Sequence, residues 1–277
     1  MNTTGKSDKK RMKRDAFLKK AVEGTREAFS SRDMLMANIS KSIEDVNKAA
    51  NLLCERLEEL YAIYFPELKL EDKEKYVKVV LIMDRKNPDA KELSGIVGSG
   101  KSNDIINKAQ RSMGVDLNET DLAECKRLAN GISGLYVLRS EYEKYLETLA
   151  KEICPNISEL VGSAIAAKLI SKTGSLSRLA ILPSSTIQVL GAERALFKHL
   201  KNKRIDPPKH GIIFQHVMIS SSPKKVRGKI ARLIANKICI AAKADHFTKN
   251  FIAPQLKKDL EEHYNKIMED YKKSKAN

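Results

Sequence analysis

Two long stretches of this sequence place an apolar residue at every third or fourth position, which is the spacing of one face of an α-helix. The first covers residues 33–65 and ends at Pro66, and the second covers residues 117–153 and ends at Pro155. Helices of roughly 33 residues would be about 50 Å long, which is too long for a compact domain and typical of an antiparallel coiled-coil arm. The candidate N-caps are Ser31 or Asp33 for the first helix and Asn118 or Thr120 for the second.

The segment between the two predicted arms, residues 70–115, has a less regular pattern. Short helices are predicted over residues 74–83 and 90–97, with a break at Pro88. Residues 95–102 read GIVGSGKS, which matches the G-x-x-x-x-G-K-S spacing of a phosphate-binding loop. Such a loop follows a buried β-strand, but the residues before this one are polar and include a proline. We therefore interpret the segment as the irregular tip that connects the two arms, with nucleotide binding as the alternative hypothesis.

The chain from residue 155 onward predicts a globular helical domain. Helices are expected over residues 156–173, 192–200 and 255–271, and Pro207-Pro208 fixes an extended loop. A further helix follows Pro223, and its apolar stripe consists of Val226, Ile230, Leu233, Ile234, Ile238 and Ala241. The predicted fold is therefore all-α. Its expected parts are a basic N-terminal arm over residues 1–30, a coiled-coil domain over residues 31–154 and a globular domain with a C-terminal helix over residues 155–277.

Positive charge is concentrated in the segment Pro183–Lys243. The whole chain has a net charge of +16, and this segment alone holds thirteen Lys/Arg against two acids, Glu193 and Asp206. Because cations flank the apolar stripe of the helix after Pro223, that helix is expected to bury one side and present a row of cations on the other. Exposed cations on a rigid frame form a positively charged surface of the kind that binds phosphate groups, which indicates a nucleic acid as partner. A generally solvated basic protein is the alternative.

The remaining composition and motifs limit the fold class and the kinds of function that are expected. Aromatic residues make up 5% of the chain and Trp is absent, which favours helices over sheets. The four cysteines form no CxxC motif, and no HExxH or GxSxG occurs, so we expect no metal site, no cofactor and no enzyme. The cysteine pattern indicates an intracellular, reducing compartment. No signal peptide or membrane-spanning run is visible, so we expect no membrane contact. Residues 1–20 are expected to be a frayed basic arm, as a solubilising tail or as an RNA contact.

Three motifs in the basic half, in a fixed order, carry a resemblance to a known family. They are GAERALFKHL from Gly191, PPKHGIIFQH from Pro207 and SSPKKVRGKIARLIANKICIAAKAD from Ser221. Together they resemble the Nop domain of box C/D ribonucleoprotein scaffold proteins, most closely the archaeal form, and the helix after Arg32 resembles the coiled-coil domain of that family. The resemblance implies a non-enzymatic scaffold that binds a kink-turn RNA together with the small protein already bound to it. It also implies pairing through the coiled coil, and a cytoplasmic location in an archaeon or a nuclear or nucleolar one in a eukaryote.

The resemblance also assigns roles to the matched residues. Those expected to contact RNA are Arg194, Lys198, Lys209, His210, Gln215, His216, Ser222, Lys224, Arg227, Lys229 and Arg232. Those expected to contact the protein partner are Gly191, Ala192 and Glu193. Two alternatives stay open from the residues alone: Glu193 as a solvated carboxylate at a helix start, and His216 as a hydrogen-bonded frame residue. Phe214 is expected in the core, and Arg227→Ala or Arg232→Ala is expected to weaken RNA binding without unfolding the protein.

One departure from the family pattern concerns the methyltransferase fibrillarin. The archaeal and nucleolar scaffolds carry a further N-terminal domain that docks fibrillarin, whereas about 30 residues precede the predicted coiled coil here, a layout closer to the spliceosomal branch of the family. Recruitment of a fibrillarin-type methyltransferase is therefore in doubt. The alternative function is a helical dimerisation module, or a regulator that pairs with a full-length scaffold relative and binds RNA only non-specifically.

Overall fold

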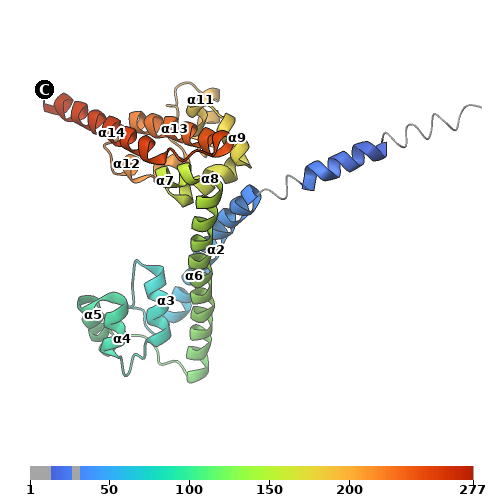
Figure 1. Cartoon of the computed structure of the whole chain (residues 1–277). Helices are drawn as coiled ribbons and strands as arrows, with labels where there is room; N and C mark the ends of the chain where they lie inside the picture. The colour runs from blue at the N-terminus through green and yellow to red at the C-terminus, as the bar shows by residue number, and fades with distance from the viewer. Residues whose placement is uncertain (1–13, 27–31, 277) are drawn as a thin grey trace, which may run out of the picture. The chain divides into compact units, whose positions relative to one another are not determined.

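All regular structure in the described part of the chain is helical, so the predicted all-α fold is confirmed (Figure 1). The structure is a computed structural model that describes residues 14–26 and 32–276. Residues 14–26 form a helix, which includes part of the predicted N-terminal arm. The remainder of the expected N-terminal arm lies outside the described residues.

The chain divides into two compact units. One unit is Lys41–Lys144, and the other combines the residues up to Ser40 with Tyr145 and everything after it. Both long helices contribute to both units: α2 covers Arg32–Tyr61 and α6 covers Glu119–Ile153. These bounds confirm the two long helices predicted from the apolar spacing. The coiled-coil character of the pair, and the domain limits assigned from the sequence, stay predictions.

The N-caps predicted for the two long helices have different outcomes. Asn118 caps α6 as expected, because its side-chain oxygen accepts a hydrogen bond from the N–H of Asp121 at 2.7 Å. Asp33 lies inside α2, and its carboxylate accepts from the N–H of Leu176 at 2.8 Å, at the start of α9 (Leu176–Ile181), whose N-cap is Ser175. Ser31 lies outside the described residues. A carboxylate at a helix start satisfies an N–H that the helix itself leaves unpaired.

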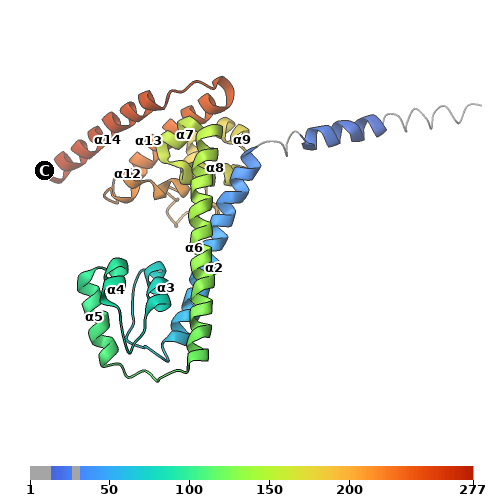
Figure 2. The ribbon, with the colours of Figure 1, turned by 60° about the horizontal axis from the view of Figure 1, so that its bottom comes forward.

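The Lys41–Lys144 unit adds three helices to the long pair: α3 (Lys73–Ile82), α4 (Ala90–Val97) and α5 (Ser99–Gln110), which lie side by side in Figure 2. Fully buried apolar side chains from α2, α3 and α6, including Leu57, Val80 and Ile132, share one core. The connection from α5 to α6 is fastened by the largely buried side chain of Arg85, whose Nη1 donates to the carbonyl oxygens of Tyr64 at 2.6 Å and of Gly114 at 2.7 Å. The unit is therefore held by a shared core and by a buried arginine.

The nucleotide-binding hypothesis for residues 95–102 is wrong, because the expected loop does not form. The residues before it belong to helix α4, whereas a phosphate-binding loop needs a β-strand there. Gly98, with φ of 83°, joins α4 directly to α5, a helix that the sequence pattern did not predict. Ser102, which would hold magnesium in such a loop, is buried and donates to the carbonyl oxygen of Ala90 at 3.4 Å.

The second unit packs short helices around one long basic helix. The expected helix over residues 156–173 is two helices, because Gly162 adopts a φ of 87° that a residue with a side chain rarely takes. In chain order the elements after α6 are α7 (Pro155–Val161), α8 (Ser163–Thr173), α9, α10 (Ser184–Val189), α11 (Glu193–Lys201), η1 (Ile212–Gln215), α12 (Val217–Ser220), α13 (Arg227–Lys243), η2 (Ala244–Thr248) and α14 (Ala253–Ala276).

Helix α13 is the centre of this unit, since α7, α9, α10, α12 and α14 all pack against it. Its predicted apolar stripe is confirmed: the residues of the stripe are buried, apart from the half-buried Leu233. Just after α13, the buried carboxylate of Asp245 accepts from the backbone N–H groups of Asn156 and Ile157, each at 3.0 Å. A helix fixed on so many sides is a rigid frame for whatever its remaining side presents to solvent.

Candidate nucleic-acid interface

The extended loop after α11 is fastened to the end of α10 by three hydrogen bonds. The N–H of Gly211 donates to the carbonyl oxygen of Gln188 at 2.9 Å, and the N–H of Ile212 donates to that of Leu190 at 2.8 Å. The side-chain amide of Gln188 donates to the carbonyl oxygen of Lys209 at 2.8 Å. A Cβ on Gly211 would lie 1.9 Å from the carbonyl oxygen of Leu190, so only glycine fits there. The predicted loop is therefore held in one conformation despite its exposure.

Three planar groups from this loop and from α13 stack on one another. The rings of His210 and Phe214 lie 4.4 Å apart at 14°, and the guanidinium carbon of Arg227 lies 5.4 Å from the centre of the Phe214 ring. Phe214 is half-buried beneath the other two groups, and so is not the fully buried core residue that was predicted. Partial burial and the nearby charge of Arg227 lower the pKa of His210, so its ring is mainly neutral at pH 7.

Arg227 holds the turn before α13 as well as facing the stack. Its Nε donates to the carbonyl oxygen of Ser222 at 2.8 Å and its Nη2 to that of Ser220 at 3.0 Å. The expectation that Arg227→Ala leaves the fold intact is therefore revised: the change removes both bonds from the turn. The assignment of Ser222 as an RNA contact is also corrected, because Ser222 is 2% exposed and its hydroxyl donates to the carbonyl oxygen of Met218 at 2.6 Å.

The exposed cations of α13 and of the turn before it lie beside the loop. The side chain of Lys209 lies against Gly228 in the first turn of α13, where a Cβ would meet its carbons at 3.7 Å. Lys224, Lys229 and Arg232 are exposed. The structure thus brings Lys209, His210 and Arg227 together at the start of α13, and places Lys229 and Arg232 along the same helix.

The motif at the start of α11 makes its own internal contacts. Oε1 of Glu193 accepts from the N–H of Gly191 at 2.7 Å, and Oε2 lies 3.9 Å from Nζ of Lys172. Partial burial opposes ionisation, but the N–H bonds and the charge of Lys172 outweigh it and lower the pKa of Glu193. This geometry fits the alternative of a carboxylate at a helix start, although the side chain keeps 45% of its surface exposed.

The other matched residues divide into exposed and internal ones. Arg194 and Lys198 are exposed on α11, and Ala192 is half-buried at its N-cap. Gln215 is exposed, and its Oε1 accepts from Nζ of Lys168 at 2.9 Å. His216 starts α12 with a buried Nδ1 that has no hydrogen-bond partner in the described part of the chain, and burial lowers its pKa. Its partial burial is consistent with a frame residue, and its contact with RNA stays a prediction.

Very few cations of the basic segment have an acidic partner. Of the thirteen Lys/Arg in Pro183–Lys243, Lys237 alone forms an ion pair among the described residues, with Asp259 at 3.2 Å and a side chain only 13% exposed. Lys237 therefore faces α14 and stabilises the packing of α13, although in the sequence it is one of the cations that flank the apolar stripe. The remaining cations carry charge that the protein does not neutralise.

The sequence motifs did not identify two kinds of residue in this region. Lys168 and Lys172 lie outside the motifs but contact Gln215 and Glu193. Phe197 and Leu200 expose 67% and 53% of their surfaces on α11. They are three residues apart in a helix rich in cations, and this spacing could have indicated that the helix exposes an apolar face.

Within the described residues, no group of three or more His, Cys, Asp or Glu is placed to hold a metal, and no helix has the length and apolar character needed to cross a membrane.

Comparison with known proteins agrees with the motifs. The family model described as "Nop: snoRNA binding domain, fibrillarin" matches residues 42–266. A NOP5 family protein of Methanocaldococcus jannaschii is 40% identical over 270 residues, which cover 94% of this chain and 65% of that protein. Nucleolar protein 58 of Mycosarcoma maydis is 35% identical over 77% of this chain and 37% of its own length. The chain thus spans less than two thirds of these relatives.

A solved structure also has a similar fold. The crystal structure of a fibrillarin/Nop5p complex contains a chain that is 26% identical, with a TM-score of 0.56 over 94% of this chain and 80% of that one. The sequence and structure comparisons therefore point in the same direction.

Proposed function

Because this chain belongs to the Nop family of snoRNA-binding proteins, we propose that it is a non-enzymatic scaffold of a box C/D-type ribonucleoprotein. Its partner is a kink-turn RNA together with the small protein that binds that RNA first. RNA contacts come from Lys209, His210, Lys224, Lys229 and Arg232, with Arg194 and Lys198 on α11. Ser222 is left out of this set because it is buried.

The observation that carries the proposal is the unneutralised charge of Pro183–Lys243. Twelve of its thirteen cations have no ion pair among the described residues, and they sit on elements fixed by α13 and by the hydrogen bonds of Gly211 and Ile212. Unpaired cations repel one another and add nothing to stability, so a protein gains from keeping them only if a polyanion neutralises them. Binding a phosphate with such a cation releases counterions, which makes the affinity strongly dependent on salt.

The exposed side of α11 supports a second partner, the protein already bound to the RNA. Phe197 and Leu200 add apolar surface next to the cations of the same helix. Buried apolar and aromatic anchors supply most of the binding energy of protein interfaces. Gly191, Ala192 and Glu193 open this helix, and the exposed part of Glu193 is available to a basic group of the partner.

A gel-shift experiment tests the proposal. A labelled kink-turn RNA is mixed with its primary binding protein, and this chain is added to the complex, to the RNA alone and to an RNA duplex without a kink-turn. The expected result is a supershift of the complex and at least about 10-fold weaker binding to either RNA alone. Equal affinity for all three would leave only a basic RNA-binding protein and would contradict the scaffold.

Pairing through the long helices has its own support in the Lys41–Lys144 unit. Leu60 in the last turn of α2 and Ile63 just after that helix expose 48% and 53% of their surfaces. Val115, whose N–H donates to the carbonyl oxygen of Ile63 at 2.9 Å, exposes 64%. Burying such a patch against a second copy, or against a relative, favours association. Sedimentation of the chain alone should give a dimer, and Leu60→Glu with Ile63→Glu should give a monomer.

Fibrillarin recruitment and cellular location are proposed on the same basis. The solved relative was crystallised with fibrillarin, and a pull-down with a fibrillarin-type methyltransferase tests whether this chain binds one as well. We place the chain in the cytoplasm of an archaeon, or in the nucleolus if it is eukaryotic, as for the relatives named nucleolar protein 58. Fractionation of the source cells checks this placement.

A further inference from the structure

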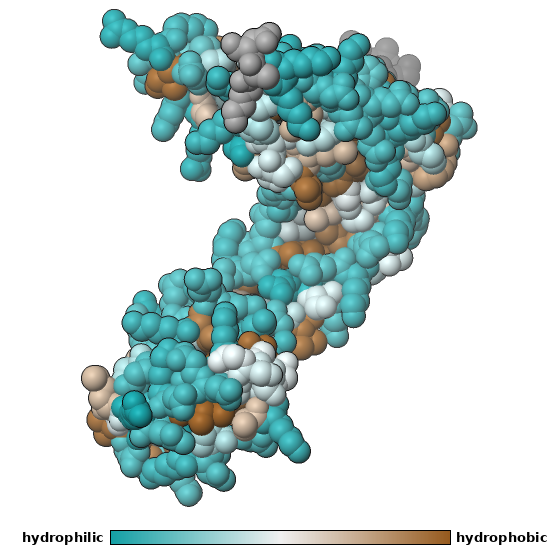
Figure 3. Space-filling view, turned by 90° about the vertical axis from the view of Figure 1, so that its left-hand side faces the viewer, coloured by the Kyte–Doolittle hydropathy of each residue, from teal (hydrophilic) through white to brown (hydrophobic). Residues whose placement is uncertain are grey.

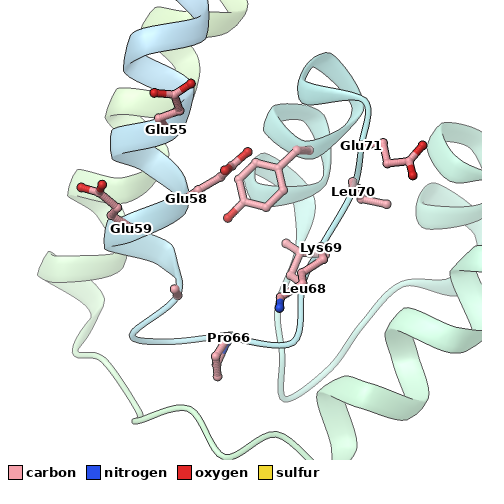
Figure 4. A pocket seen from close by; sticks show the side chains of 10 residues that line it. Glu55, Glu58, Glu59, Pro66, Leu68, Lys69, Leu70 and Glu71 are labelled. Carbon is pink, nitrogen blue, oxygen red and sulfur yellow. The ribbon is translucent and has the colours of Figure 1, made fainter.

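A groove with an acidic lining lies between the end of α2 and the connection from α2 to α3, within the Lys41–Lys144 unit. Its volume is about 790 Å³, and Figure 4 shows its side chains. Glu55, Glu58 and Glu59 line it from α2 and Glu71 lines it from the connection, against a single cation, Lys69. A concentration of carboxylates is unexpected in a chain whose net charge is +16.

Two of the four carboxylates already have cationic partners. Glu55 pairs with Lys73 at 3.0 Å and Glu59 pairs with Arg56 at 2.6 Å. Glu58 receives only a long contact from the thiol of Cys54 at 3.9 Å, and Glu71 has no ion pair within the described residues. In Figure 4, Glu58 extends from α2 into the groove, and Glu71 lies on the segment across from that helix. Glu58 and Glu71 are therefore the carboxylates that a cationic ligand would meet.

Tyr76 is a second and independent indication of a ligand. Its side chain lines the groove and is 3% exposed, yet its hydroxyl has no hydrogen-bond partner in the described part of the chain. Burial, and next to it the charge of Glu58, raises the pKa of Tyr76, so the hydroxyl stays protonated and keeps a lone pair free to accept an N–H. A hydroxyl at the wall of the groove that is not bonded to the described residues can accept an N–H from a ligand.

The remaining walls of the groove are apolar and come from Ala62, Pro66, Leu68 and Leu70. A lysine side chain matches both features, because its four-carbon stem packs on apolar surface while its ammonium group carries three N–H donors. The space exceeds what one side chain fills, since pockets of roughly 300–1,000 Å³ take whole drug-sized molecules. An extended peptide with several lysines fits the volume and the two unpaired carboxylates.

We propose that this groove is a docking site for a lysine-rich peptide segment of a protein partner. One ammonium group binds Glu58 and the hydroxyl of Tyr76, and a neighbouring lysine binds Glu71. The site is separate from the basic surface of Pro183–Lys243 and attracts ligands of the opposite charge. It therefore lets one chain hold an RNA and a basic protein segment without competition between them.

Fluorescence anisotropy tests the proposal on the full chain without RNA. The probe is a fluorescein-labelled peptide of five lysines and two glycines, and a peptide with glutamate in place of lysine is its control. Glu58→Gln combined with Glu71→Gln should weaken binding at least about 10-fold at low salt. Tyr76→Phe should weaken it by about 3-fold to 10-fold with an unchanged or higher Tm, because the hydroxyl has no partner to lose in the free protein.

Glu92→Gln on α4 is the matched control, since it removes one exposed carboxylate from the same unit outside the groove and should leave the affinity unchanged. An equal loss in Glu92→Gln, or no loss in the double variant, would reduce the effect to general charge attraction and overturn the proposal. Spermidine is added as a competitor. If it displaced the peptide at a lower concentration than free peptide does, the groove would be a polyamine site, and peptide docking would be rejected.

Discussion

The Lys41–Lys144 unit and the Pro183–Lys243 segment are both rich in charged residues, but they use them in opposite ways. The unit holds 17 Lys/Arg and 19 Asp/Glu, whereas the segment holds 13 and 2. Cations of the unit that have acidic partners include Lys48, Arg56, Lys73, Lys78, Arg85, Lys86, Lys108, Arg127 and Arg139. In the segment, among the described residues, only Lys237 has one.

This difference provides a criterion for distinguishing charges that stabilise the fold from charges that bind a partner. An ion pair on a helix surface contributes a few tenths of a kcal/mol and cancels the field of both groups. A cation without a partner contributes nothing to the fold and keeps its field, so it attracts phosphate from a distance. Charge composition alone does not tell these two uses apart. The pairing of each side chain does.

The largest expected effect is on the buried arginine of the Lys41–Lys144 unit. Arg85→Ala removes the donor that satisfies the carbonyl oxygens of Tyr64 and Gly114 and the ion pair with Asp116. Its side chain is 10% exposed, so the loss should lower the free energy of unfolding by about 3–5 kcal/mol. Urea denaturation followed by circular dichroism measures it. Lys101→Ala, at an exposed site of the same unit, is the control and should change stability by less than about 0.5 kcal/mol.

The next effect is on RNA binding by the segment. Lys224→Ala, Lys229→Ala and Arg232→Ala combined should weaken binding to the RNA–protein complex by about 100-fold, and lower the salt slope by roughly 2–3. The Tm should not change, because these side chains are exposed and have no ion pairs in the described part of the chain. Binding is measured by filter retention between about 50 and 200 mM salt.

The control for the triple variant removes the same charge from the other unit. Lys75→Ala, Lys91→Ala and Lys101→Ala combined should leave the RNA affinity within about 2-fold, because these exposed lysines lie outside the basic segment. An equal loss in this control would mean that net charge, and not the surface around α13, drives binding. That outcome would contradict the conclusion that the two regions use their charges differently.

A smaller effect separates two lysines of the same helix. Lys229→Ala should weaken RNA binding by about 3-fold to 10-fold and leave the Tm unchanged. Lys237→Ala should leave RNA binding unchanged and lower the free energy of unfolding by about 0.5–1 kcal/mol, because its partner Asp259 lies on α14. Gel shift and thermal denaturation of both variants check this. The reverse pattern would mean that the ion pair does not decide how these lysines are used.

The smallest effect is a dependence of stability on pH. The hydrogen bond and the charge of Lys237 lower the pKa of Asp259 below its unfolded value of about 3.9. The stabilisation is therefore present above that unfolded value and is lost as the pH falls through the lower folded pKa. The Tm of the wild type and of Lys237→Ala, measured between about pH 6 and pH 2, should converge at the acidic end. Parallel curves over the whole range would contradict the role assigned to this pair.

The helices were predictable to the extent that their apolar faces repeat over many turns. The helices α2 and α6, whose apolar residues repeat over many turns, and the apolar stripe of α13 were predicted correctly. Helix α5 was missed because it is short, follows Gly98 and has three apolar residues, Ile105, Ile106 and Ala109, and its packing against α4 is a tertiary contact. The split of α7 from α8 was missed because a glycine within a helix pattern signals a break only when its φ is known.

The sequence by itself determined the all-α fold, the family and the concentration of cations in Pro183–Lys243, because period, motif order and charge are properties of the chain alone. Only the tertiary structure decided what each polar side chain does. It placed Lys237 beside Asp259, buried Ser222, bonded Arg227 to the turn before α13 and, among the described residues, gave the hydroxyl of Tyr76 no hydrogen-bond partner. The physical reason is that hydrogen bonds and ion pairs need groups within about 3–4 Å, and those neighbours come from distant parts of the chain.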